Sequence, residues 1–219
     1  MTLDHVRLIA HRGNSAALPE NSLAAFRSAW RLGAHMIELD VHLSRDGFPV
    51  VIHDDTVDRT TTGSGPVASL RLSQLQRLGI PALEDVLDLP IPLCIELKTA
   101  AAMQAVVELV GRREDVILSS TDWDALDFLR QLDPRRRVGY LASADRASAG
   151  VERALAGGGA YALQPEWGAV TDELVARCRA AGLRVMSYTV NEPELGRRLF
   201  EMGVDAIFTD DPGRMLAIL

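Results

Sequence analysis

Seven residues that could do chemistry stand in or just after strand-like runs of the chain. They are two histidines, three carboxylic acids, one arginine and the only lysine of the chain, namely His11, Arg12, Glu38, Asp40, His53, Glu96 and Lys98. Two imidazoles can divide the roles of general acid and general base near neutral pH. Three carboxylates offer hard oxygen donors, which suit Mg²⁺ or Ca²⁺ better than zinc. The arginine and the lysine would add positive charge for an anionic group such as a phosphate.

The spacing of these residues favours a common site. Glu38 and Asp40 are two residues apart in an extended run, as are Glu96 and Lys98, so each pair lies on one face of its strand. Two carboxylates in an apolar run are costly to bury unless they are paired or bind a metal. A solvated strand edge is the alternative for the acids, and the histidines could be satisfied structural residues. Arg12 could be a surface charge, and Lys98 could form an ion pair with Glu96 or a neighbouring acid.

The elements that must position these residues alternate along the chain. Short apolar runs predict strands at 7–10, 36–40, 93–97, 116–120, 138–141, 161–164, 184–188 and 206–209. Apolar residues at three- and four-residue spacing predict helices at 21–32, 101–112, 122–132, 146–155, 172–181 and 193–202. This α/β alternation favours parallel strands, and eight of them predict a closed (β/α)8 TIM barrel. In such a barrel, functional residues lie at the carboxyl ends of the strands.

One segment interrupts the alternation. The runs 41–44 and 49–53, joined at Arg45-Asp46-Gly47, predict a β-hairpin with an Asp-Gly turn and a return arm that ends in His53. Residues 54–92 then form a short insertion in place of a crossover helix, with helical pieces at 73–78 and 83–87. No linker divides the chain, so we expect a single domain over residues 1–219 with an open mouth above the strand ends.

Composition excludes several classes of protein. Of the 219 residues, 47% are hydrophobic and 24% are charged, which is typical of a globular protein. A net charge of −7 argues against nucleic acid as a partner, because phosphate backbones need a basic face. No apolar run approaches the ~18–20 residues of a membrane span, and we expect no signal peptide before the first strand. Two distant cysteines, Cys94 and Cys178, predict free buried thiols and a cytoplasmic location.

Several other features receive a structural interpretation. Asn21 is the expected cap of the first helix. His42 shares the strand face of the two acids before it, but it lies in the hairpin, so we do not expect it to bind a metal. The segment Thr209-Asp210-Asp211-Pro212 predicts a helix cap, and Asp210 could also face the rim of the barrel. The run Gly157-Gly158-Gly159 predicts a connection between a helix and a strand.

An ordered series of short motifs between residues 11 and 213 resembles the glycerophosphodiester phosphodiesterase family. The motifs are His11-Arg12-Gly13, Pro19-Glu20-Asn21-Ser22, Ala25-Phe26, Glu38-Leu39-Asp40-Val41, Asp46-Gly47, Val50–Asp54, Arg59-Thr60-Thr61, Glu96-Leu97-Lys98, Thr189-Val190-Asn191, Gly203-Val204-Asp205 and Thr209-Asp210. Each tripeptide alone is a weak signal, whereas their order over nearly the whole chain is highly specific.

The resemblance implies metal-dependent hydrolysis of glycerophosphodiesters, such as glycerophosphocholine and glycerophosphoethanolamine, to glycerol 3-phosphate and an alcohol. The family's ligands for one divalent cation (Mg²⁺, Ca²⁺ or Mn²⁺) match Glu38, Asp40 and Glu96. Its catalytic histidines match His11 and His53. Its phosphate contacts match Arg12 and Lys98. The family often has tryptophan where Tyr188 stands, so Tyr188 is expected to pack against substrate or in the core.

The sequence leaves several points open. Either histidine could be the acid, and either water or a neighbouring substrate hydroxyl could attack first, the latter through a cyclic phosphate. A lysophospholipase D-type enzyme on the same scaffold and a catalytically silent barrel that binds phosphate ligands are the alternative functions. The alcohol of the substrate, the physiological metal and the oligomeric state are not determined by the sequence.

Overall fold

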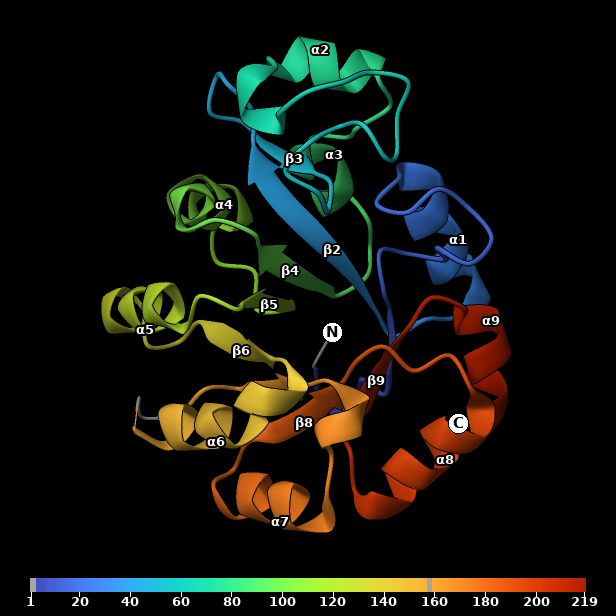
Figure 1. The fold of residues 1–219 in the computed structure, drawn as a ribbon, viewed down its shortest axis with the longest axis vertical. Coiled ribbons are helices and arrows are strands. Elements are labelled where there is room, and N and C mark those ends of the chain that lie inside the picture. Colours follow the sequence, from blue (N-terminus) through green and yellow to red (C-terminus); the bar gives the residue numbers. More distant parts are fainter. Residues whose placement is uncertain (1–2, 157–158) are drawn as a thin grey trace.

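The parallel strands of the chain close into a barrel with helices on its outside (Figure 1). The computed structural model describes residues 3–156 and 159–219, so Gly157 and Gly158 of the predicted helix–strand connection lie outside the described residues. The strand order is β1-β9-β8-β7-β6-β5-β4-β2, and a pairing of β1 with β2 closes the ring. The predicted (β/α)8 TIM barrel is therefore confirmed.

The expected strands and outer helices are present, and their bounds differ from the prediction by at most two residues, except at the end of β2. The barrel strands are β1 Leu8–Ala10, β2 Met36–Leu43, β4 Leu93–Leu97, β5 Val116–Ser120, β6 Arg137–Ala142, β7 Ala162–Pro165, β8 Arg184–Ser187 and β9 Ala206–Thr209. The outer helices are α1 Leu23–Leu32, α4 Met103–Val110, α5 Trp123–Leu132, α6 Ala147–Ala156, α7 Asp172–Ala180, α8 Pro193–Met202 and α9 Pro212–Met215. Across residues 3–156 and 159–219, no helix has both the length and the apolar character that crossing a bilayer requires.

The cap of α1 differs from the prediction. Ser22, not Asn21, is the N-cap residue, and its hydroxyl accepts a hydrogen bond from the Ala25 N–H at 3.2 Å. Asn21 adopts a positive φ of 55° and donates from Nδ2 to Asp40 Oδ2 at 2.7 Å. The predicted cap was therefore wrong by one residue, because the side chain of Asn21 is used to hold an acid of the barrel.

The interior of the barrel has an apolar floor and a polar upper level. The floor contains Ile9, Met36, Cys94, Ile117, Ala162, Met186, Ala206 and Phe208, with Leu3 and Val6 beneath them in the chain's first turn. Side chains alternate across a strand, so every second residue points to the same face. Met36 therefore shares its face with Glu38 and Asp40, and Cys94 shares its face with Glu96. Burial of the apolar floor thus fixes which way the acids point.

The expected hairpin is an extension of a barrel strand (Figure 1). β2 runs unbroken to Leu43 and pairs antiparallel with β3, Pro49–Val51, so the run expected at 41–44 is part of β2. The return arm is shorter than the expected 49–53, which places His53 in a loop beyond it. After it come α2 Leu72–Arg77 and α3 Leu83–Leu87. The return arm and the insertion share a small core, made of Val50, Ile52, Val57, Val67, Leu75 and Ile80.

Candidate active site

Three carboxylates from two neighbouring strands meet at the carboxyl end of the barrel. The parallel register pairs Asp40 of β2 with Glu96 of β4, and Glu38 lies two residues earlier on the same face. One carboxylate oxygen of each residue lies within 4.8 Å of those of the other two. The pairing of β2 with β4 therefore turns two distant sequence motifs into a single acidic cluster.

Burial and crowding give these carboxyls different pKa values. Burial and the charge of Asp40 raise the pKa of Glu38 to about 8. The same two causes raise the pKa of Glu96. Burial also opposes the ionised form of Asp40, but the charges of Lys98 and Arg12 outweigh it and lower the pKa of Asp40. A cation bound between crowded carboxyls of this kind would favour the ionised form of all three.

The cluster fits a hard divalent cation. Asp40 Oδ1 is buried, and within residues 3–156 and 159–219 its close contact with Lys98 Nζ at 2.9 Å is an ion pair without hydrogen-bond geometry, so the oxygen accepts no hydrogen bond there. This oxygen therefore has lone pairs left for a ligand. All three residues offer carboxylate oxygens, which are the donors that Mg²⁺ and Ca²⁺ prefer.

Two cations stand next to the acids. Lys98 Nζ donates to Glu96 Oε1 at 2.7 Å, so the ion pair considered as an alternative role is present. Arg12 has a positive φ of 56°, and its backbone N–H donates to Glu38 Oε2 at 2.9 Å. The guanidinium of Arg12 lies 3.2 Å from Asp40 Oδ2 through Nε. Both cations also line the cavity described below, where an anionic group could contact them.

His11 follows β1, and its ring is held by Asp210. His11 Nδ1 donates to Asp210 Oδ1 at 2.7 Å, and Asp210 also accepts from Ser15 Oγ at 3.1 Å and Asn191 Nδ2 at 2.7 Å. Burial opposes ionisation of Asp210, but the hydrogen bonds with His11 and Asn191 outweigh it and lower its pKa to about 2. Burial also opposes protonation of His11, whereas Asp210 and the charge of Glu38 prevail and raise the pKa of His11.

His53 is held in a similar way by the next residue. His53 Nδ1 donates to Asp54 Oδ1 at 2.7 Å. Asp54 accepts two further hydrogen bonds from Arg59. The pKa of Asp54 is lowered mainly by the hydrogen bonds from Arg59 and secondly by the one from His53. His42 Nε2 donates to the carbonyl oxygen of His53 at 3.1 Å, so His42 supports this loop. In both catalytic candidates a carboxylate occupies Nδ1, which leaves Nε2 for a substrate.

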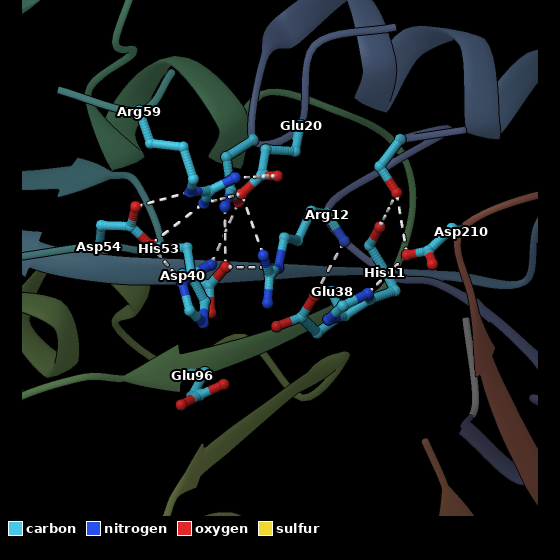
Figure 2. A network of polar contacts seen from close by, with 12 residues as sticks. His11, Arg12, Glu20, Glu38, Asp40, His53, Asp54, Arg59, Glu96 and Asp210 are labelled. Carbon is cyan, nitrogen blue, oxygen red and sulfur yellow. Dashed lines mark hydrogen bonds and ion pairs between the residues drawn. The ribbon is translucent and has the colours of Figure 1, made fainter. Parts of the chain in front are cut away.

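These side chains surround a cavity of about 320 Å³ at the rim of the barrel. Its lining residues are His11, Arg12, Glu38, His53, Glu96, Lys98, Ser119, Thr121, Leu141, Gln164, Tyr188, Thr189 and Phe208. Figure 2 shows the His53–Asp54 pair on one side and the His11–Asp210 pair on the other, with Glu38 next to His11 and with Asp40 and Glu96 on the side of His53. Asp40 is buried next to this cavity, and Tyr188 lines it while its hydroxyl donates to the Ala142 carbonyl at 3.1 Å. The structure thus brings all eight predicted site residues together.

Another hollow lies at the opposite end of the barrel. It has a volume of about 430 Å³ and is lined mainly by arginines between Arg112 and Arg137, near the first residues of β5 and β6. Among the residues that the structure describes, its lining includes neither a histidine nor a cluster of three acids. The chemistry is therefore assigned to the cavity at the carboxyl ends of the strands.

The residues that support the histidines were not predicted from the sequence as part of the site. Asp210 was expected mainly as part of a helix cap, but Asp211 caps α9 by accepting from the Arg214 N–H at 3.0 Å, and Asp210 faces the rim. No function was predicted for Glu20 or Arg59. Two features of the sequence could have indicated them: both residues belong to the ordered motifs, and Asp54 directly follows His53.

The barrel, the acidic cluster and the two histidine–carboxylate pairs fit the class of TIM-barrel phosphodiesterases that the sequence motifs indicated. The model of the Glycerophosphoryl diester phosphodiesterase family matches residues 11–92 and 88–214. A glycerophosphodiester phosphodiesterase of Caldanaerobacter subterraneus subsp. tengcongensis is 35% identical over an alignment of 242 positions, gaps included, that covers 97% of each chain. The chain belongs to the glycerophosphoryl diester phosphodiesterase family.

Solved structures agree with this assignment. A glycerophosphodiester phosphodiesterase from Thermotoga maritima superposes with a TM-score of 0.89 at 30% identity, covering 98% of this chain and 99% of the other. A phosphodiesterase from Oleispira antarctica, solved in complex with the product sn-glycerol-3-phosphate, has a TM-score of 0.88 at 31% identity, covering 97% and 96%. The chain is therefore an enzyme of the glycerophosphodiester phosphodiesterase class.

Proposed function

We propose that this enzyme uses one divalent cation to hydrolyse small glycerophosphodiesters, such as glycerophosphocholine and glycerophosphoethanolamine, to glycerol 3-phosphate and an alcohol. The observation that carries the proposal is the two histidines, each with Nδ1 on a carboxylate, at the same cavity as three crowded acids. Glycerol 3-phosphate is also the product bound to the similar Oleispira antarctica phosphodiesterase.

Glu38, Asp40 and Glu96 would hold the cation, as Mg²⁺, Ca²⁺ or Mn²⁺. When bound, it would polarise the phosphoryl group and neutralise the charge that develops there. Arg12 and Lys98 bind the remaining phosphate oxygens, because both line the same cavity as positive groups. Arg12 and Lys98 thereby orient the diester towards the histidines.

His11 and His53 transfer the protons. One imidazole takes a proton from the attacking hydroxyl through Nε2, and the other gives a proton to the leaving alkoxide. The hydrogen bond from Nδ1 to a carboxylate keeps each ring in the tautomer and orientation that this requires. The ring of Tyr188 lines the cavity and packs against the substrate.

The barrel and the insertion 54–92 act as one catalytic unit of a single domain over residues 1–219. Supporting this, His53 leads into the insertion, whereas the three acids come from barrel strands.

We also propose a cytoplasmic location, because Cys94 and Cys178 are both free and buried. The negative charge of the chain supports a small-molecule substrate over nucleic acid.

Metal reconstitution tests this proposal. Protein treated with a chelator is reloaded with Mg²⁺, Ca²⁺ or Mn²⁺ and assayed against glycerophosphocholine and lysophosphatidylcholine. We expect the metal to restore hydrolysis, with glycerophosphocholine as the better substrate. His11→Ala and Glu38→Ala should each lower kcat by about 10²-fold or more, because each removes a group that acts on the reacting phosphate.

The control is Glu201→Ala, which removes an exposed acid of α8 and should leave kcat unchanged. All variants should keep the thermal unfolding transition of a folded barrel. Full activity in His11→Ala or Glu38→Ala would overturn the site assignment. A strong preference for lysophosphatidylcholine would favour the lysophospholipase D alternative, and failure of every metal to restore activity would favour the catalytically silent barrel.

A further inference from the structure

Arg59 lies between two carboxylates that belong to different parts of the site (Figure 2). One edge of its guanidinium faces Asp54, with Nε 2.7 Å from Oδ2 and Nη2 3.1 Å from Oδ1. The other edge faces Glu20, with Nη1 2.8 Å from Oε2 and Nη2 2.8 Å from Oε1. A single planar group therefore forms two bidentate pairs, the strongest geometry available between arginine and a carboxylate.

Each of these carboxylates is also in contact with a proposed functional residue. Asp54 Oδ1 accepts from His53 Nδ1 at 2.7 Å, and Glu20 Oε1 accepts from Arg12 Nη1 at 3.0 Å. These contacts form one continuous network of side chains that runs from His53 through Asp54, Arg59 and Glu20 to Arg12. The network joins the loop after β3 to the segment between β1 and α1, which are separate in the sequence.

The network is too exposed to be explained as a stabilising ion pair alone. The side chain of Arg59 is 48% exposed, and exposed ion pairs contribute little to the free energy of unfolding. The bidentate geometry on both edges, in contrast, restricts the orientation of both carboxylates. Glu20 and Asp54 are more buried than Arg59, with 20% and 27% of their side chains exposed.

We propose that Arg59 is a positioning residue that fixes the distance between His53 and Arg12 across the cavity. It acts through Asp54 on the orientation of the His53 ring, and through Glu20 on the guanidinium of Arg12. This inference rests on the roles proposed above for His53 and Arg12. A lysine cannot replace Arg59 fully, because a single ammonium cannot present two bidentate edges.

Steady-state kinetics of the metal-loaded enzyme on glycerophosphocholine test the inference. Arg59→Ala should lower kcat/KM by about 10- to 100-fold, as expected when a supporting hydrogen bond to a site residue is lost. The loss should be divided into a lower kcat, through His53, and a higher KM, through Arg12. Arg59→Lys should recover part of the loss. The thermal unfolding transition should stay within a few degrees of the wild type.

The matched control is Arg77→Ala. Arg77 is an exposed arginine of α2 in the same insertion, and in the described part of the chain it forms no ion pair. We expect wild-type kinetics for this variant. An Arg59→Ala enzyme with the same kinetic constants as Arg77→Ala would overturn the inference.

Further variants separate the two arms of the network. Asp54→Asn should lower mainly kcat, and Glu20→Gln should raise mainly KM. If Arg59 acts through Asp54, the double variant Asp54→Asn/Arg59→Ala should have the kcat of Asp54→Asn within about twofold. Additive losses in kcat would contradict the inference.

His53→Ala, measured in the same series, distinguishes failure of the inference from failure of the proposed function. Full kcat in His53→Ala would overturn the proposed role of His53 and, with it, the arm of the network that runs through Asp54. A large loss in His53→Ala together with a wild-type Arg59→Ala would overturn only the role of Arg59.

Discussion

The two histidine–carboxylate pairs have the same contact but different supports. His11 lies 2.7 Å from Asp210, and His53 lies 2.7 Å from Asp54. The first pair follows two strands in register, because Ala10 of β1 pairs with Thr209 of β9 and the His11 N–H donates to the Thr209 carbonyl at 2.8 Å. The second pair lies in a loop beyond β3, where no strand ladder fixes it.

The carboxylates are held by different chemistry. Asp210 accepts from the neutral donors Ser15 and Asn191, whereas Asp54 accepts from the charged Arg59. The side chain of His11 is also less exposed than that of His53, at 19% against 34%. Asp210, which follows a paired barrel strand, is therefore held by neutral hydrogen-bond donors, whereas Asp54, which lies in a loop, is held by the charged guanidinium of Arg59.

The largest effect, on kcat, is expected when either of the two supporting carboxylates is replaced by an amide. Asp210→Asn should lower kcat on glycerophosphocholine by about 10²-fold, because the less exposed His11 loses the charge that stabilises its protonated form. Asp54→Asn should lower kcat by about tenfold, because water can reach the more exposed His53 and partly replace the lost contact. Both are measured by steady-state kinetics with saturating metal. A larger loss in Asp54→Asn would contradict the idea that the ladder side is the more sensitive one.

A smaller effect, on the free energy of unfolding, is expected from substitutions at two glycines with the same φ. Gly13, next to the His11 side, and Gly47, in the hairpin turn before His53, both have φ of 84°. A Cβ on Gly13 would lie 2.7 Å from the backbone carbon of Ala25, whereas a Cβ on Gly47 would meet nothing within 4 Å.

Gly13→Ala should therefore lower the free energy of unfolding by about 2–4 kcal/mol, from backbone strain plus overpacking. Gly47→Ala serves as its matched control and should cost about 1 kcal/mol from backbone strain alone. Urea unfolding at neutral pH measures both. Equal losses would show that the barrel side is no more tightly packed than the hairpin.

The smallest effect concerns acid stability. The pKa of Asp210 is lowered to about 2, below its ordinary value of 3.8, so its ionised form stabilises the folded state above about pH 4. This contribution is lost as the pH falls from about 4 to about 2. Its size is on the order of 1 kcal/mol, after allowance for the 34% of the side chain that is exposed. The raised pKa of His11 acts in the opposite direction and at higher pH, where its contribution is lost on deprotonation.

Urea unfolding of the wild type and of Asp210→Asn between pH 5 and pH 2.5 measures this contribution. The wild type should lose about 1 kcal/mol more than the variant over this range. Asp172→Asn, which changes an exposed acid in the first turn of α7, should follow the wild type. Parallel curves for the wild type and Asp210→Asn would show that Asp210 does not stabilise the fold through its charge.

Much of the site could be predicted because its residues follow strand periodicity. Glu38, Asp40 and Glu96 share strand faces with apolar residues of the barrel floor, so burial of that floor dictates their direction. The supporting residues could not be predicted in the same way. Glu20 and Arg59 lie in loops 39 positions apart, and no periodic pattern indicates which side chains of two loops will meet.

By itself the sequence determined the barrel, the family and the set of polar residues at the strand ends. Strand and helix periods, glycine turns and short motifs are local properties, so they can be read along the chain. Only the tertiary structure decided that Asp210 holds His11 and that Arg59 joins Asp54 to Glu20. These contacts depend on the register with which the ring closes and on how the insertion packs, and both are set by side chains far apart in sequence.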